Sequence, residues 1–204
     1  IFEAYGAIEL YPTLMFIDDP ENLPRLRPYG LIGAGVFKFD PKGSITNAQG
    51  VTTWHKLHPL RTEGQGMAEY PDKKPYSLTQ INIPMGLGVR YQFTERFNGC
   101  FELLYRKTFT DYIDDVSTTY IDPNLFDVYL TPEQALIARE IHDKTVGIVT
   151  PGVNRYEPGT QRGNSKQMDA YFSLALRFGV TLGEVSETRP DRRARQQMRC
   201  PHFF

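Results

Sequence analysis

The fold is decided by one stretch of this chain, Ser77-Leu78-Thr79-Gln80-Ile81-Asn82-Ile83-Pro84-Met85-Gly86-Leu87-Gly88-Val89-Arg90-Tyr91-Gln92-Phe93. Its odd positions from Ile81 to Phe93 are apolar or aromatic, and most of its even positions are polar or small. This period of two is typical of a β-strand with one apolar and one polar face. The strand is also long, because about five or six residues suffice in a soluble domain, whereas crossing a bilayer at a tilt takes about 9–11.

A second stretch, from Met168 to Leu182, repeats the pattern, with apolar residues at its even positions. Two such strands favour an all-β fold, an antiparallel transmembrane β-barrel, in which alternate residues face lipid and interior. The alternative is a soluble barrel or sandwich with long strands that bury the same apolar residues.

Composition narrows the class of protein further. The chain has 204 residues, is 40% hydrophobic and carries a net charge of −1, which gives no case for nucleic-acid binding. A mean hydropathy of −0.42 and the lack of an apolar run of about eighteen residues exclude a helical membrane protein. A barrel accommodates so polar a composition because half of each strand faces inward. The 12 Tyr and 13 Phe residues are enough for aromatic girdles.

Three further strands are predicted, at Phe2–Phe16, Tyr29–Phe39 and Phe97–Thr108. The connections over residues 18–28 and 94–96 are short, whereas residues 40–75 and 109–167 form loops too long for ordinary hairpins. One helix is predicted in the second long loop. Thr131 as the cap, Pro132 at the first helical position and Gln134 as the third residue after the cap indicate a helix that runs to about Asp143.

These elements predict a barrel over residues 1–182 and a separate tail over residues 183–204. Outer-membrane barrels have short periplasmic turns and long extracellular loops, so the tail and the short turns are expected in the periplasm. The chain opens inside a strand pattern without an initiator Met, which indicates a mature or truncated product. Five strands are visible, and three more upstream would complete the smallest common barrel, which has eight.

The inward positions carry acids and bases in equal number, and we expect them to pair across a plugged lumen because an unpaired buried charge is costly. Gln80 and Asn82 are also predicted to face inward. The residues predicted to face lipid include Ile81, Ile83, Leu87, Phe172, Leu174 and Phe178. The predicted lumen charges are Glu3, Glu9, Lys38, Arg90, Glu102, Arg106, Asp169 and Arg177.

No motif of a hydrolase or metalloenzyme surrounds the histidines, so we expect no catalytic residue, no cofactor and no metal. Calcium ligation by the acidic residues of the second long loop is a weaker alternative to loop capping, because their spacing is not that of an EF-hand. The histidines, expected on the surface or in loops, are His55, His58, His142 and His202, and the acids are Asp111, Asp114 and Asp115.

The C-terminal tail combines five arginines with an apolar end, Met198, Cys200, Pro201, Phe203 and Phe204. A solvated, disordered terminus is the usual fate of a charged end, but solvation does not favour the apolar residues. We therefore predict that the tail docks onto a periplasmic partner. Cys100 faces inward about 10 Å from the short turn, so we favour a buried free thiol there and a disulfide from Cys200 to a partner, over an internal bond or two free thiols.

Five further segments of the chain carry a family resemblance: Pro59–Gly66, Arg106–Tyr120, Arg162–Asn164, Arg189–Arg193 and Arg199–Pro201. They resemble the PorG-type outer-membrane proteins of Bacteroidota. The resemblance implies an eight-stranded barrel of the type IX secretion machinery, associated with a periplasmic ring built from a lipoprotein and its partner. It implies a non-enzymatic anchor in the outer membrane, and the rival hypothesis is an outer-membrane enzyme or a small pore. The tail residues expected to bind the partner are Arg189, Asp191, Arg192, Arg193, Arg199, Cys200 and Pro201.

Overall fold

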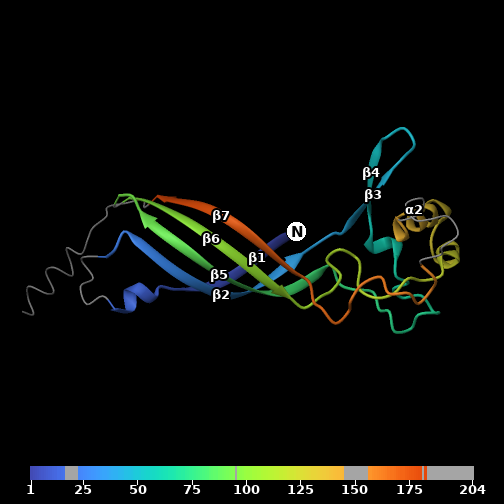
Figure 1. Cartoon of the computed structure of the whole chain (residues 1–204), viewed down its shortest axis with the longest axis horizontal. Coiled ribbons are helices and arrows are strands. Elements are labelled where there is room, and N and C mark those ends of the chain that lie inside the picture. Colours follow the sequence, from blue (N-terminus) through green and yellow to red (C-terminus); the bar gives the residue numbers. More distant parts are fainter. Residues whose placement is uncertain (17–22, 95, 145–155, 181, 183–204) are drawn as a thin grey trace, which may run out of the picture. The chain divides into compact units, whose positions relative to one another are not determined.

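The computed structural model describes residues 1–16, 23–94, 96–144, 156–180 and 182. Its largest element is a five-stranded, antiparallel sheet with the strand order β1-β2-β5-β6-β7 (Figure 1). Consecutive strands of this order are therefore neighbours along the chain or are joined by one of the long loops. The strands are β1 (Phe2–Leu10), β2 (Leu26–Lys38), β5 (Thr79–Gln92), β6 (Phe97–Thr108) and β7 (Ala170–Val180).

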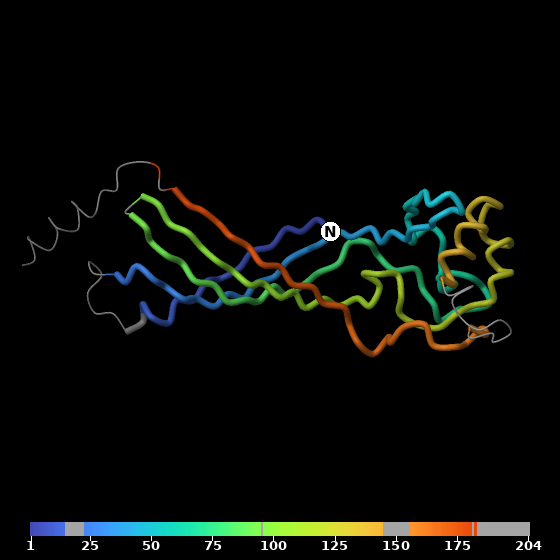
Figure 2. Tube along the Cα trace, turned by 45° about the horizontal axis from the view of Figure 1, so that its top comes forward, coloured from blue at the N-terminus to red at the C-terminus, as the bar shows by residue number. Residues whose placement is uncertain are grey.

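All five predicted strands are present, and β5 and β6 run side by side in the trace of Figure 2. The first strand is shorter than predicted. It ends at Leu10, and Pro12–Phe16 form the 3-10 helix η1. Proline explains the change, because it cannot donate to the ladder and its fixed φ suits the first position of a helix.

The three central strands, β2, β5 and β6, each have one exposed face and one face with buried residues, whereas the edge strands β1 and β7 have half-buried positions at most. On β5 and β6 the even positions are buried or half-buried, as predicted, and Asn82 and Glu102 are each 2% exposed. The odd positions of β5 carry exposed apolar side chains such as Leu87, which is 70% exposed, and the even positions of β7 carry others such as Leu174, which is 63% exposed. We call the side of Asn82 and Glu102 the inner face and the side of Leu87 and Leu174 the outer face. Contiguous exposed apolar surface of this kind is rare on soluble monomers.

The sheet curls toward its inner face. The edge strands β1 and β7 would lie roughly 19 Å apart in a flat five-stranded sheet. Even so, Arg177 Nη2 on β7 lies 3.7 Å from Glu9 Oε1 on β1. Likewise, the rings of Phe37 on β2 and Tyr171 on β7 have centroids 5.6 Å apart. Contacts between strands that are not neighbours require the inner face to be concave.

The loops hold structure that the sequence analysis missed. Residues 40–75, predicted only as a loop too long for an ordinary hairpin, contain the hairpin β3 (Lys42–Thr46) and β4 (Thr52–Lys56) and the 3-10 helix η2 (His58–Leu60). The second long loop contains η3 (Pro123–Leu125), α1 (Phe126–Tyr129) and α2 (Pro132–His142). The predicted capping box is confirmed, because Thr131 Oγ1 accepts from the Gln134 N–H and the Gln134 side chain accepts from the Thr131 N–H.

The chain divides into two compact units, each with its own buried cluster. One unit comprises Ile1–Ile8, Ile32–Met85 and the described part of Tyr105–Phe172. Its core lies in the loops and consists of Leu57, Leu60, Met67, Ile121, Phe126, Ala135, Ala138 and Ile141. The other unit comprises the described residues of Glu9–Leu31, Gly86–Leu104 and the segment from Ser173, and its cluster on the inner face consists of Tyr29, Leu31, Cys100 and Leu104. None of the helices in the described residues has the length and apolar character to cross a membrane.

Candidate functional site

The first of two polar groups on the inner face is centred on the carboxylate of Glu3. Arg106 Nη2 lies 3.0 Å from Glu3 Oε2, and the Arg106 side chain is only 9% exposed. Asn82 Nδ2 donates to Glu3 Oε1 at 2.6 Å and to the Tyr171 hydroxyl at 2.9 Å. Four strands, β1, β5, β6 and β7, thus contribute to one hydrogen-bonded group.

The second polar group on the inner face is built around Arg177. Its Nη2 pairs with Glu102, and Tyr29 donates to the same carboxylate oxygen at 2.8 Å. Arg90 Nη2 lies 3.0 Å from Glu9, the acid that also faces Arg177. The Tyr29 ring fits because its neighbour Gly88 has no side chain; a Cβ there would lie 2.3 Å from the ring. We call the two groups together the inner-face network.

The predicted lumen charges are therefore found in ion pairs at six of their positions, Glu3, Glu9, Arg90, Glu102, Arg106 and Arg177. Lys38 was predicted to face inward. The structure places it on the exposed face of β2, the face that also carries Val36, so that prediction is wrong. The cause is the apolar composition of both β2 faces, which hides the alternation. Asp169 lies just before β7, and its carboxylate accepts from the Ile113 N–H at 2.8 Å instead of pairing with a base.

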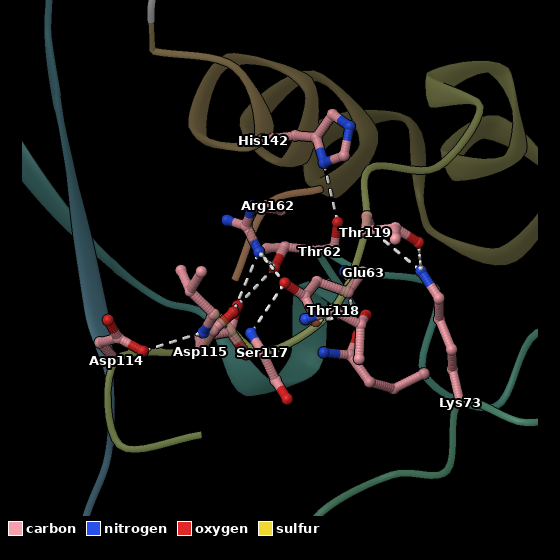
Figure 3. Close-up of polar contacts among 12 residues, drawn as sticks. Thr62, Glu63, Lys73, Asp114, Asp115, Ser117, Thr118, Thr119, His142 and Arg162 are labelled. Carbon is pink, nitrogen blue, oxygen red and sulfur yellow. Dashed lines mark hydrogen bonds and ion pairs between the residues drawn. The ribbon is translucent and has the colours of Figure 1, made fainter. Parts of the chain in front are cut away.

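The loops bring a third polar group together, which we call the loop centre. Glu63 is fully buried, and its carboxylate accepts from the Ser117 N–H at 3.0 Å, the Thr118 N–H at 2.9 Å and the Thr118 hydroxyl at 2.8 Å. Arg162 Nη1 lies 3.1 Å from Glu63 Oε1 and also donates to Thr62 Oγ1 at 3.0 Å. Figure 3 shows the Arg162 guanidinium directed at these two residues.

Asp115 extends the loop centre. Its carboxylate accepts from the Thr62 hydroxyl and from the Tyr76 hydroxyl, each at 2.5 Å. Burial raises the pKa of Asp115 above its ordinary value, and the two hydrogen bonds partly offset this shift because they favour the charged form. Burial also raises the pKa of Tyr76, so the phenol stays protonated and acts as a donor.

His142 connects helix α2 to the same place. Its Nδ1 lies 2.8 Å from the Thr62 carbonyl oxygen, so this nitrogen carries the proton and donates (Figure 3). Burial lowers the pKa of His142 below its ordinary value. The sequence analysis expected a surface or loop histidine here, and the 5% exposure of His142 overturns that expectation.

The loop centre is a buried, hydrogen-bonded group. The Glu63 carboxylate accepts its hydrogen bonds from protein donors, and Glu63 and Asp115 are both fully buried residues. What the arrangement does is hold the segments around Glu63, Ser117 and Arg162 in one conformation.

These three segments lie within those that carry the family resemblance, Pro59–Gly66, Arg106–Tyr120 and Arg162–Asn164. Their meeting in space was not predicted from the sequence. The available signal was an acid and a base, Glu63 and Arg162, placed in long loops beside glycine and short polar residues. The predicted site residues of the tail, Arg189, Asp191, Arg192, Arg193, Arg199, Cys200 and Pro201, lie outside the described residues.

Comparison of the chain with protein-family models, with curated proteins and with solved structures finds no match. The described residues define the fold class alone, a mostly antiparallel β-protein with one large sheet and short helices in its loops.

Proposed function

We propose that this chain is an outer-membrane β-barrel without enzyme activity that anchors a periplasmic ring of the type IX secretion machinery. The membrane part of this proposal is supported above all by the outer face of the sheet. There Phe172, Leu174 and Phe178 are 73%, 63% and 78% exposed on one strand. Moving a large apolar side chain out of water lowers the free energy, and in a bilayer a whole sheet face of such side chains can contact lipid.

A barrel also accounts for the curl of the sheet. Closure removes unpaired strand edges, which are costly in lipid, and it encloses the inner-face network. We propose a barrel of eight strands, in which further strands lie between β1 and β7. In so narrow a barrel the side chains of the inner-face network fill the lumen. The chain should therefore give no steady conductance in planar bilayers, whereas a stable single-channel current would support the rival pore.

The ring-anchoring part is proposed from the resemblance to PorG-type proteins and from the composition of the tail. An arginine-rich segment suits acidic surfaces, because guanidinium groups pair bidentately with carboxylates. We propose that Arg189, Asp191, Arg192, Arg193, Arg199, Cys200 and Pro201 contact a periplasmic ring lipoprotein or its partner.

A pull-down from solubilised envelopes tests the anchor. An affinity tag placed in the turn between Asn47 and Val51, whose residues are exposed, leaves the tail untouched. The tagged chain should recover both ring components, and the double change of Arg192 and Arg193 to Gln should lose them. Lys166→Gln, which removes an exposed charge from a loop, is the control and should not change recovery. Recovery of no ring component by the unchanged chain contradicts the proposal.

A disulfide from Cys200 to a periplasmic partner is part of the same proposal. Cys100 is 6% exposed, and its Sγ lies 2.7 Å from the Tyr29 hydroxyl, a position that suits a free thiol. On non-reducing gels of native envelopes we expect an adduct of higher mass that reductant removes and that Cys200→Ser abolishes. A monomer band that reductant leaves unchanged refutes the disulfide.

A further inference from the structure

An apolar groove with a volume of about 600 Å³ lies on the outer face of the sheet, within the unit that contains the loops. A Cβ added at Gly6 would have no atom within 4 Å, so the groove is open at that position. Its volume is in the range of small-molecule sites. The outer-face residues that line it include Ala4, Gly6, Ala34, Ile81, Ile83 and Phe109.

The groove lies at one end of the sheet. Strands β2 and β6 finish at this end and β5 begins there, so both long loops start from it. In the proposed barrel the long loops are extracellular. The groove therefore faces the outer leaflet of the membrane, close to the lipid headgroups.

Two lysines flank the groove. On the five strands of the sheet they are the only charged residues at outer-face positions, and both are exposed. Lys38 ends β2 two residues after Val36, which lines the groove, and Lys107 precedes Phe109 by two residues, so each lies within about 7 Å of the lining along the chain. Among the described residues no carboxylate lies within ion-pair distance of either lysine.

The charge of these lysines indicates the kind of ligand. A lysine on the lipid side of a barrel is costly near the middle of the bilayer and tolerated near its interface, where the apolar stem lies along the protein and the ammonium reaches the headgroups. An ammonium at that depth attracts anionic headgroups, and lysine is a common partner of phosphate. An apolar groove beside two such cations complements a molecule that joins an acyl chain to a phosphate.

We propose that this groove binds a bilayer lipid with an anionic phosphate headgroup. An acyl chain lies in the groove, and Lys38 and Lys107 attract the headgroup. This inference rests on the proposed membrane location of the outer face, to which it adds a preferred lipid and a place for it.

Quenching of tryptophan fluorescence by brominated lipids measures this preference at a chosen position. Trp54→Phe removes the single tryptophan, and Phe109→Trp places a new one in the groove. The full chain is reconstituted in phosphatidylcholine vesicles with increasing fractions of brominated phosphatidate. We expect phosphatidate to bind beside the new tryptophan at least about 5-fold more tightly than phosphatidylcholine, because one lysine near the surface contributes about this factor.

Leu176→Trp in the same background is the control for position. Leu176 is exposed on the outer face of β7, which lies two strands away from β5 in the sheet. The attraction of a lysine falls off within a Debye length, so the preference for phosphatidate should be less than about 2-fold there.

Replacing both lysines tests the charge. Lys38→Gln together with Lys107→Gln should lower the preference at Phe109→Trp to less than about 2-fold. Lys144→Gln, which removes an exposed charge after α2, should leave it unchanged. Circular dichroism checks that the variants are folded, and the comparison of the two tryptophan positions needs no lysine variant.

Three results would overturn the site. An equal preference at both tryptophan positions would show a general attraction of anionic lipid. Quenching at Leu176→Trp but not at Phe109→Trp would show that protein, either a second copy or a partner, covers the groove, and it would leave the proposed membrane location intact. Quenching at neither position would contradict the membrane location together with the site.

Discussion

The inner-face network and the loop centre solve the problem of buried charge in different ways. In the loop centre Glu63 is fully buried and Arg162 is 8% exposed, and backbone N–H groups complete the shell of the acid. In the second group of the inner-face network, built around Arg177, the Glu9 side chain is 28% exposed and that of Arg177 is 49% exposed. In the loop centre the buried acid depends on each of its donors. Around Arg177, by contrast, water and a second base can replace a lost partner. The difference indicates that the ion pair in the loops depends more strongly on its individual partners than the ion pairs around Arg177 do.

The largest expected effect comes from removing the same group in both regions. Glu63→Gln should lower the free energy of unfolding by about 3–5 kcal/mol, because it leaves Arg162 buried without a counter-charge. Glu9→Gln should cost about 0–1 kcal/mol, because its partners remain near water. Urea titration followed by circular dichroism measures both. Equal losses in the two variants would erase the comparison.

A charge on the outer face sharpens the comparison, because lipid cannot compensate for it. Leu174→Arg should cost about 2–4 kcal/mol in a bilayer if Leu174 lies near its middle. Gln80→Ser, a change on the inner face, should cost little. Unfolding in lipid vesicles measures both changes, and a similar small cost for each would mean that Leu174 faces water.

The pH dependence of the loop centre is the next effect in size. Burial lowers the pKa of His142, so between this pKa and about 6.5 the unfolded chain binds a proton that the folded chain does not. Stability should therefore fall as the pH drops below 6.5, with a slope of up to about 1.4 kcal/mol per pH unit. Asp115, whose pKa is raised, acts with the opposite sign in more acidic solution.

Comparison with His142→Asn isolates this contribution, since asparagine keeps a donor for the Thr62 carbonyl but takes up no proton. The difference in unfolding free energy between the two proteins should change between pH 7.5 and pH 5. A difference that is constant over this range would show that His142 titrates normally.

The smallest expected effect concerns the cap of α2. Thr131→Ala removes the acceptor of the Gln134 N–H and should cost about 1 kcal/mol. Thr160→Ala, at an exposed position outside any helix, should stay within about 0.5 kcal/mol of the unchanged chain. Urea titration separates the two, and a loss as large as that of Glu63→Gln would mean that the helix end, and not the loop centre, organises the loops.

Sequence alternation was sufficient to predict the strands, because burial on one face forces a period of two on long segments such as Thr79–Gln92. It failed for Lys38, where both faces of β2 are apolar, and at Pro12, where a helical turn replaces the strand. The helix α2 was predictable because its cap is local in sequence.

The loop centre could not be predicted in the same way. Glu63 and Arg162 are 99 residues apart, and no local pattern indicates that such residues meet. The buried Gln65 Nε2, which has no hydrogen-bond partner among the described residues, was equally hidden, since pairing depends on which neighbours reach an atom and not on its position in the chain. Local sequence patterns therefore predict the helices and strands of this chain, whereas the polar groups depend on contacts between residues far apart in the sequence.

The central claim is that the outer face of the sheet lies in lipid, and quenching of tryptophan fluorescence by brominated lipids tests it most directly. The chain has a single tryptophan, Trp54, so Trp54→Phe gives a silent background. One tryptophan is then placed in turn at each residue from 172 to 176, and the protein is reconstituted in vesicles. We predict strong quenching at Phe172, Leu174 and Leu176 and weak quenching at Ser173 and Ala175. Uniformly weak quenching, or quenching without a period of two, would contradict the account.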